Sequence, residues 1–355
     1  MCNLAGYTGS RRAAPILIEM LKREQYYDGG LSTGIATLDN GKIYTTKLVG
    51  NVDDLLHSTD AWDFPGTIGI AHSRPGKNGV NQAHPFTDNS GHLALCLNGT
   101  LRDVDTDAFY SLSQSIMQDF LDRGFTIKSA IAKNGRHKPL SNGMTYHDTE
   151  PYALMVGDWC DNGMDLFTAL GKAIGTLPGD NVTLAIHDSL PDTIAIGRIT
   201  RPMEVGIGED ECYIATTSMA FPEDHRFRSI QSAPEAAVTA VRPGSFEITA
   251  APVENCRIQQ IDPCIYARAY ARVETMLKTA DKPLTIYDFP FFDKWQDLWQ
   301  KPYVDCQYRQ PHGLLKPYGA LEYQILSAMR KAGLISEIRC ETNTKGLIGF
   351  VWNQK

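Results

Sequence analysis

The chain begins Met1-Cys2, which places a thiol at the first residue after the initiator methionine. Cysteine is small enough for methionine aminopeptidase to remove Met1, and removal leaves Cys2 with a free α-amine. An α-amine titrates at about 7.7–8.0 in peptides, so it can act as general base for its own side chain. A cysteine at position 2 can also occur by chance. A free cysteine thiol is mostly protonated at neutral pH, and a nearby base would convert it to the nucleophilic thiolate. We predict that Cys2 is a catalytic nucleophile.

Attack of a thiolate on an amide needs donors for the oxyanion that develops. Asn98-Gly99 follows the apolar run LALCL, where a strand over 93–97 is expected to end in a turn. The Asn98 side-chain amide and the Gly99 backbone N–H are suitable donors. The alternative is a plain hairpin turn, because Asn-Gly is the commonest sequence of such turns.

Two charged residues are candidates for holding an amino-acid substrate. Arg74 ends an apolar strand, and its planar guanidinium suits a carboxylate. Asp148 could accept from an α-ammonium group, and as an alternative it could cap the helix that follows it. An arginine at a strand end is also commonly a surface charge.

The elements that must position these residues alternate along the first 250 residues. Apolar spacing predicts helices at 13–22, 107–121, 149–156 and 166–174. Alternating patterns predict strands at 2–7, 33–38, 42–48, 67–72, 93–97, 182–187, 193–199, 204–206, 213–216 and 246–249. Two groups of strands with helices between them indicate a layered α+β domain. The unpatterned segment 129–145 is expected to be a surface loop of the kind that shapes a pocket or closes over it.

The pattern changes after residue 250, which divides the chain into a domain at 2–250 and a small α/β appendage at 251–355. Helices are expected there at 265–279 and 319–332, with strands at 335–340 and 346–352. No internal repeat is evident.

Composition narrows the classes of function. The net charge of −7 argues against a nucleic-acid partner, and no apolar run reaches the length of about 20 residues that a membrane span needs. The chain start lacks the apolar core of a secretory signal. The eight cysteines include no C-x-x-C pair, which predicts reduced thiols in a cytoplasmic protein, with neither a metal site nor a cofactor.

Five motifs then occur in the order known from one enzyme family. The start MCNLAGY resembles the M-C-G-I-x-G-Y start of class II glutamine amidotransferase domains, and residues 13–55 resemble the glutaminase half of glucosamine-6-phosphate synthase. IGIAHSRPGKNGVNQAHPFTD is similar to that family's G-I-G-H-T-R-W-A-T-H-G…N-A-H-P loop. LNGT and YHDTE resemble its H-N-G turn and its S-E-T-D-T-E segment.

The resemblance implies a fold, a reaction and a role for each matching residue. The fold is the four-layer αββα sandwich of N-terminal-nucleophile hydrolases, and the substrate is glutamine or a related γ-glutamyl amide. Cys2 matches the nucleophile, and Asn98 and Gly99 match the oxyanion hole. Arg74 matches the residue that binds the substrate carboxylate, and Asp148 the one that binds its ammonium. The implied products are glutamate and ammonia, formed through a Cys thioester.

One motif departs from the family pattern at residues that help to seat the carboxylate. Pro75-Gly76-Lys77-Asn78 stands where the family has W-A-T-H, so its threonine and histidine are absent. Lys77 and Asn78 are the candidate replacements in substrate binding. The alternative is that the substrate differs from plain glutamine.

The destination of the ammonia stays open, because residues 251–355 resemble neither a sugar isomerase nor a phosphoribosyltransferase. One possibility is a stand-alone amidohydrolase. A second is a glutaminase subunit that delivers ammonia to a separate synthase partner, and a homodimer is a further possible assembly. A third is a catalytically inert relative that serves as a regulatory or binding module.

Overall fold

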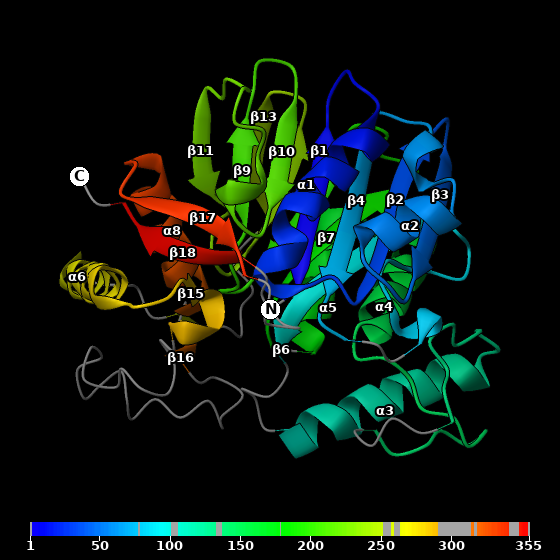
Figure 1. Cartoon of the computed structure of the whole chain (residues 1–355). Helices are drawn as coiled ribbons and strands as arrows, with labels where there is room; N and C mark the ends of the chain where they lie inside the picture. The colour runs from blue at the N-terminus through cyan, green and yellow to red at the C-terminus, as the bar shows by residue number, and fades with distance from the viewer. Residues whose placement is uncertain are drawn as a thin grey trace.

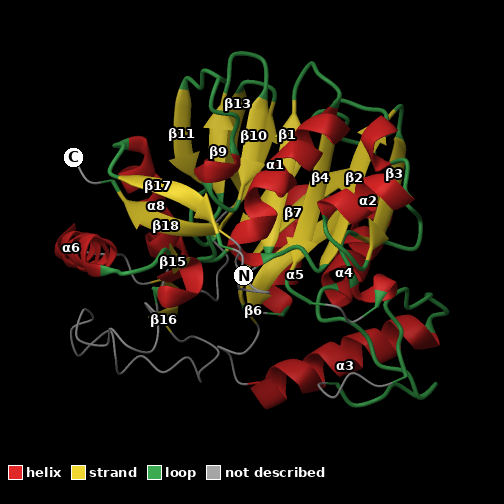
Figure 2. Cartoon of the chain, in the orientation of Figure 1, coloured by secondary structure: helices red, strands yellow, loops and turns green. Residues whose placement is uncertain are grey.

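Two large β-sheets with helices on their outer faces make up the main unit, by which we mean the described residues between 2 and 250 (Figures 1 and 2). The computed structural model describes residues 2–76, 79–100, 106–132, 137–177, 179–250, 257–258, 263–289, 314–315, 318–340 and 348–353. The mixture of helices and sheets confirms the predicted α+β class.

The first sheet has seven strands in the order β11-β9-β10-β1-β4-β2-β3, and all neighbouring strands are antiparallel. Its hairpin β2–β3 turns at Asn40 and Gly41, which both have positive φ, as this tight turn requires. The strands are β1 Asn3–Thr8, β2 Ser32–Asp39, β3 Lys42–Leu48, β4 Ile68–Arg74, β9 Glu204–Ile207, β10 Cys212–Ala215 and β11 Ser229–Ser232.

The second sheet has six strands in the order β13-β12-β8-β7-β6-β5. These are β5 Phe86–Thr87, β6 Leu93–Thr100, β7 Asp180–His187, β8 Ile194–Arg198, β12 Ala237–Arg242 and β13 Ser245–Ala250. The sequence prediction omitted β5, β11 and β12. Strand β5 has only two residues, and β11 is mostly exposed, so neither shows the alternation of apolar residues on which the prediction depends.

Helices cover both sheets. They are α1 Ala13–Asp28, α2 Val52–Ser58, α3 Thr106–Asp122, α4 Glu150–Asp161 and α5 Leu166–Thr176, with short 3₁₀ turns η1 Ala61–Asp63, η2 Val80–Gln82 and η4 Ser218–Ala220. Helix α1 runs six residues beyond its predicted end. Polar residues such as Glu24 and Gln25 hid this last part, yet both are buried. Helix α2 was not predicted; it begins at a capping box formed by Asn51 and Asp54.

Three apolar cores hold these layers together. One joins α1 and α2 to the seven-stranded sheet through residues such as Leu17 and Ile35. A second lies between the two sheets and includes Leu4 and Leu184. A third joins α3, α4 and α5 to the six-stranded sheet. Both faces of each sheet are packed against other layers. This packing fixes the register of the strands, because a slip of one residue would move every side chain of a strand to the opposite face.

The C-terminal unit, which we define as described residues 263–289, 318–340 and 348–353, has its own core. It contains α6 Pro263–Thr279, β15 Leu284–Thr285, η5 Ile286–Asp288, α8 Tyr318–Lys331, β17 Ile335–Arg339 and β18 Ile348–Trp352, while β14 Arg257–Ile258 pairs with β16 Leu314–Leu315. Tyr27 and Met219 of the main unit belong to the same core, and Tyr27 stacks on Phe350 at 5.9 Å between ring centroids. The two units therefore share one apolar boundary.

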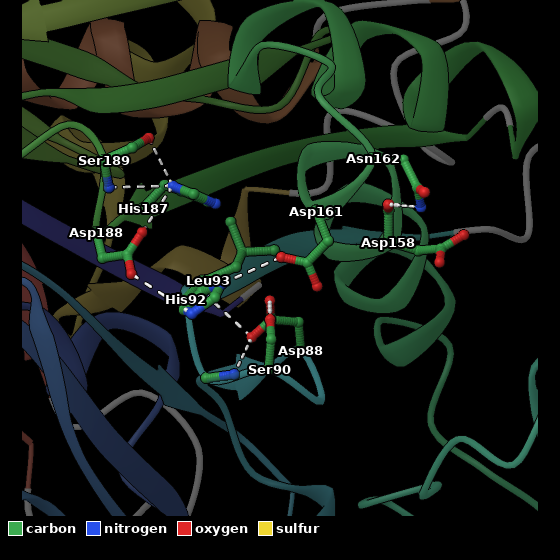
Figure 3. A network of polar contacts seen from close by, with 11 residues as sticks. Asp88, Ser90, His92, Leu93, Asp158, Asp161, Asn162, His187, Asp188 and Ser189 are labelled. Atoms are coloured by element: carbon green, nitrogen blue, oxygen red, sulfur yellow. Dashed lines mark hydrogen bonds and ion pairs between the residues drawn. The ribbon is translucent and has the colours of Figure 1, made fainter.

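A network of acids and histidines lies where β6 begins and β7 ends (Figure 3). His92 Nδ1 contacts Asp161 Oδ1 at 3.1 Å, and His187 Nδ1 contacts Ser189 Oγ at 2.8 Å. Among the residues that the structure describes, no group of His, Cys, Asp and Glu is arranged to hold a metal ion. The network consists of hydrogen bonds and ion pairs around the strand ends, in which Asp88 and His187 are buried and His92 is exposed.

We expect Asp161→Asn to lower the pKa of His92. The hydrogen bond to Asp161 raises this pKa above its usual range. A histidine with a raised pKa stabilises the fold below its unfolded pKa of about 6.5, and the contribution is lost as the pH rises through the folded value. His92 is exposed, so we expect less than about 1 kcal/mol. NMR titration of His92 measures the change, and an unaltered pKa in this variant would contradict it.

Candidate active site

The Asn98 side chain forms two hydrogen bonds with the backbone of Cys2. Cys2 N donates to Asn98 Oδ1 at 3.2 Å, and Asn98 Nδ2 donates to Cys2 O at 2.7 Å. The two residues are 96 positions apart in the sequence, and Asn98 is buried. Figure 1 shows the N-terminal end of the chain where both sheets approach the C-terminal unit. The structure thus joins two of the predicted catalytic residues directly.

The backbone at Asn98 and Gly99 differs from the expected turn. Strand β6 continues to Thr100, with Asn98 opposite Val182 and Gly99 opposite Asn181. The expected turn after residue 97 is therefore wrong, and so is the alternative of a plain hairpin turn. A Cβ on Gly99 would lie 2.6 Å from Asp180 O and 2.8 Å from Asn181 Cα, so the close approach of β7 requires glycine.

We expect Gly99→Ala to lower the free energy of unfolding by about 1–3 kcal/mol, because neither backbone contact can move aside cheaply. The matched control is Gly171→Ala in α5, where a Cβ would meet only Val238 Cγ2 at 3.4 Å. That variant should be neutral or more stable, since alanine favours a helix interior. Denaturant unfolding of both proteins checks this, and equal effects would contradict it.

The thiol of Cys2 is subject to opposing influences. Cys2 is half-buried as a residue, and desolvation is the largest influence on its pKa, which it raises. The positive chain terminus, Arg74 and Arg201 lower the pKa by smaller amounts. The thiol is therefore mainly protonated at neutral pH, and a nucleophile at this place requires a base within reach.

Arg74 lies at the same end of the sheet as Cys2. It is the last residue of β4, one position beyond Ser73, which pairs with Asn3 of β1. Its Nη1 donates to Gln82 O at 2.8 Å and contacts His147 Nε2 at 2.8 Å. Arg74 is half-buried, so it is a fixed internal cation and not a simple surface charge.

Asp148 follows His147, and the His147 side chain contacts Arg74. The two predicted substrate-binding residues, Arg74 and Asp148, are therefore linked by His147. Asp148 Oδ1 also contacts His137 Nε2. The expected N-cap role is wrong, because the N-cap of α4 is Thr149. His137 belongs to the segment 129–145, which is tied back by mutual hydrogen bonds between Ile131 and Thr145 of 3.0 and 2.8 Å. This segment therefore reaches the Asp148 carboxylate.

Comparison with known proteins places this geometry in context. Glutamine–fructose-6-phosphate aminotransferase (isomerizing) of Pyrococcus horikoshii is 29% identical over 226 residues, covering 62% of this chain and 33% of that protein. The protein of the same name from Bacteroides thetaiotaomicron is 32% identical over 231 residues, covering 63% of this chain and 33% of that protein. The chain thus spans about a third of the length of these relatives. The part that aligns, about 230 residues, is similar to the class II glutamine amidotransferase domain of these relatives, and we call it the class II domain. No family model matches the chain.

A solved structure shares the fold of this class II domain. Glutamine phosphoribosylpyrophosphate amidotransferase of B. subtilis superposes with a TM-score of 0.57 at 17% sequence identity. The match covers 79% of this chain and 59% of that chain. At this level of identity the likeness concerns the fold.

The class II domain also holds residues that the sequence did not single out. The charge of Arg201 lowers the pKa of the Cys2 thiol. Arg201 Nε lies 2.9 Å from Oδ2 of Asp180, the residue of β7 that pairs with Thr100 of β6. No local pattern marks it, because it comes from a turn far along the chain. The predicted Lys77 and Asn78 lie outside the described residues.

Two histidines lie behind Arg74 in the class II domain. His72 and His84 are buried, with ring centroids 4.0 Å apart. Burial first, and then neighbouring positive charges that include Arg74, lower the pKa of His72 well below its usual range, and burial does the same for His84. Both rings are therefore neutral at neutral pH, and the positive charges that act on them are those of Arg74 and Lys47. His84 stands in the NQAHP motif, whose resemblance to N-A-H-P could have marked it.

Proposed function

We propose that the class II domain hydrolyses the side-chain amide of glutamine, or of a related γ-glutamyl compound, to the free acid and ammonia. The observation that carries the proposal is the pairing of Cys2 with Asn98, beside Arg74 and Arg201. The relatives are named glutamine–fructose-6-phosphate aminotransferases, and about 230 residues of this chain align with them. We also propose Cys2–Asn98–Gly99 as the catalytic set and Arg74 and Asp148 as the substrate-binding set.

The proposed reaction begins with removal of Met1, which turns Cys2 N into an α-amine held by Asn98 Oδ1. This amine takes the thiol proton, and the thiolate attacks the amide carbon. The oxyanion is stabilised by the second N–H of Asn98 Nδ2 and by the Gly99 N–H. The C–N bond then breaks, the protonated amine gives its proton to the leaving ammonia, and water hydrolyses the γ-glutamyl thioester.

Substrate orientation follows from the fixed charges. The Arg74 guanidinium is held by Gln82 O and His147, and such a planar cation suits the substrate α-carboxylate. The Asp148 carboxylate suits the substrate α-ammonium, and His137 of the segment 129–145 contacts this carboxylate. Lys77 and Asn78 remain proposed contributors to the carboxylate end.

We further propose that the fold is the αββα sandwich of N-terminal-nucleophile hydrolases, with the domain at 2–250 and an appendage at 251–355. The outer helices and paired sheets support it. No described helix is long and apolar enough to cross a membrane. We also propose a separate synthase partner that takes up the ammonia. The relatives are named as aminotransferases, and this chain spans about a third of their length.

The test of this function is chemical labelling with 6-diazo-5-oxo-norleucine, a reactive glutamine analogue. Intact mass should show the loss of Met1 and one label, and peptide mapping should place that label on Cys2. Ammonia release from glutamine should stop in proportion to labelling. An active protein that retains Met1, or one that is labelled elsewhere, would refute the mechanism.

A further inference from the structure

A buried histidine contacts the aspartate that we propose for the substrate α-ammonium group. His137 Nε2 contacts Asp148 Oδ1. An ionised carboxylate only accepts hydrogen bonds, so Nε2 carries the proton of this contact and donates it. The His137 side chain has no exposed surface, whereas the Asp148 side chain is 18% exposed. The histidine therefore holds the carboxylate from the interior, and the accessible part of Asp148 faces outward.

Two aromatic side chains hold the His137 ring. Its centroid lies 4.1 Å from that of Tyr146, with 32° between the ring planes, and 4.8 Å from that of Tyr110, with 89° between the planes. Tyr146 is itself buried, and its Oη lies 3.0 Å from Ser113 Oγ. Tyr110 and Ser113 both belong to α3. These contacts fix the plane of the imidazole and hence the direction in which Nε2 donates.

The start of the segment 129–145, which carries the histidine, is tied to residues on both sides of Asp148. Ser129 N donates to Glu150 Oε2 at 3.0 Å, and Ser129 Oγ accepts from His147 N at 2.8 Å. Glu150 is buried and begins α4, two positions after the aspartate. The segment and the carboxylate are therefore built on the same backbone, which sets the place of one relative to the other.

A fixed carboxylate is better suited to an ammonium ligand than a mobile one. Binding orders the side chains that it uses, and a carboxylate that is already held by a donor loses less freedom in that step. A carboxylate can accept about four hydrogen bonds, so acceptance from His137 is compatible with acceptance from an α-ammonium group. Through His147, Asp148 is also linked to Arg74. The groups for the two charged ends of an α-amino acid are thus held in one arrangement.

We propose that His137 is a positioning residue, which fixes the Asp148 carboxylate and makes the site selective for amides that carry a free α-ammonium group. The inference rests on the proposed function for the nature of the substrate, and on the contact between the two side chains for the role of the histidine. Without the donor, the carboxylate turns away from the ammonium, while the contacts of Arg74 stay in place. Glutaramic acid, which is glutamine without its α-amino group, is the ligand that separates the two ends.

The test measures binding of L-glutamine and of glutaramic acid to the full-length Cys2→Ala protein by calorimetry, so that turnover plays no part. His137→Phe in this background keeps an aromatic ring beside Tyr110 and Tyr146 but removes the donor. We expect it to raise the Kd of glutamine by about 5- to 20-fold and to change that of glutaramic acid by no more than about twofold. His137→Gln places an amide N–H where Nε2–H was, so it should recover most of the affinity for glutamine.

The matched control is His92→Phe. His92 Nδ1 also contacts an aspartate, Asp161 Oδ1, at 3.1 Å. It precedes β6, whose other end carries Asn98, so it lies away from the site. Both affinities should equal those of the parent protein.

Four outcomes would overturn the inference. An equal loss for both ligands would show that His137 supports the pocket in general, and tighter binding of glutamine would show that it competes with the ammonium. Unchanged affinities would show that it has no part in binding, and a loss as large in His137→Gln would assign the effect to ring shape. If His137→Phe does not fold, His137→Asn removes the donor with a smaller polar side chain and must give the same selective loss.

Labelling of Cys2 in the wild-type protein decides the proposed function separately. A protein that is labelled, but whose preference for glutamine over glutaramic acid does not depend on His137, overturns this inference alone. A protein that is neither labelled nor able to bind glutamine overturns both.

Discussion

Cys2→Ala should reduce ammonia release from glutamine by on the order of 10⁴-fold or more, because the variant has no group that can form the covalent intermediate. The contacts to Asn98 involve only the backbone of residue 2, so alanine keeps them. Alanine is also small enough for Met1 to be removed. The initial rate of ammonia formation at saturating glutamine measures the effect.

The control for this variant is Cys160→Ala, which removes another half-buried thiol from helix α4. That protein should keep the wild-type rate and still take one label from the glutamine analogue. Unfolding of Cys2→Ala should stay within about 1 kcal/mol of the wild type. Substantial hydrolysis by a folded Cys2→Ala protein would refute the assignment of the nucleophile.

Asn98→Ala is expected to lower kcat by about 100- to 1,000-fold, which is the usual cost of losing one oxyanion donor. The same change removes the acceptor that orients Cys2 N and the donor that holds Cys2 O. KM should change little, since Arg74 and Asp148 are left in place. Steady-state kinetics with glutamine separate the two parameters.

A matched control exists elsewhere in the chain. Asn89 makes the same pair of bonds to one backbone unit, accepting from Thr126 N at 2.8 Å and donating to Thr126 O at 3.1 Å. Asn89→Ala should therefore cost stability through an equivalent loss of contacts while kcat stays unchanged. If the two variants lose activity equally, Asn98 acts through general stability and not at the reaction centre.

The C-terminal unit packs against the part of the main unit that leads to Cys2. It clamps the end of α1 through contacts such as Tyr27 Oη to Glu337 Oε1 at 2.5 Å and Arg339 over the Tyr26 ring at 4.7 Å. The end of α1 in turn borders Asn3, next to the nucleophile. A short series of contacts therefore connects the C-terminal unit to the residue next to Cys2.

Much of the main unit was predictable from the sequence. Strand β1, the hairpin β2–β3 and helix α5 carry their own apolar periodicity and turn residues, and these are local properties of the chain. Cys2, Arg74, Asn98, Gly99 and Asp148 were likewise identified by type and order, before any contact between them was known. Order along the chain was enough to suggest the chemistry.

Tertiary structure alone decided how these residues act together. Asn98-Gly99 reads locally as a turn, yet pairing with β7, more than 80 positions away, keeps it in a strand and aims the amide at Cys2. Arg201 influences the Cys2 thiol from a distant segment, and no local pattern marks it. The physical reason is the same in each case: local propensity is weak, and long-range pairing and burial override it. The sequence determined that Cys2 is a candidate nucleophile; the fold decided which side chain holds its backbone and which charges lower the pKa of its thiol.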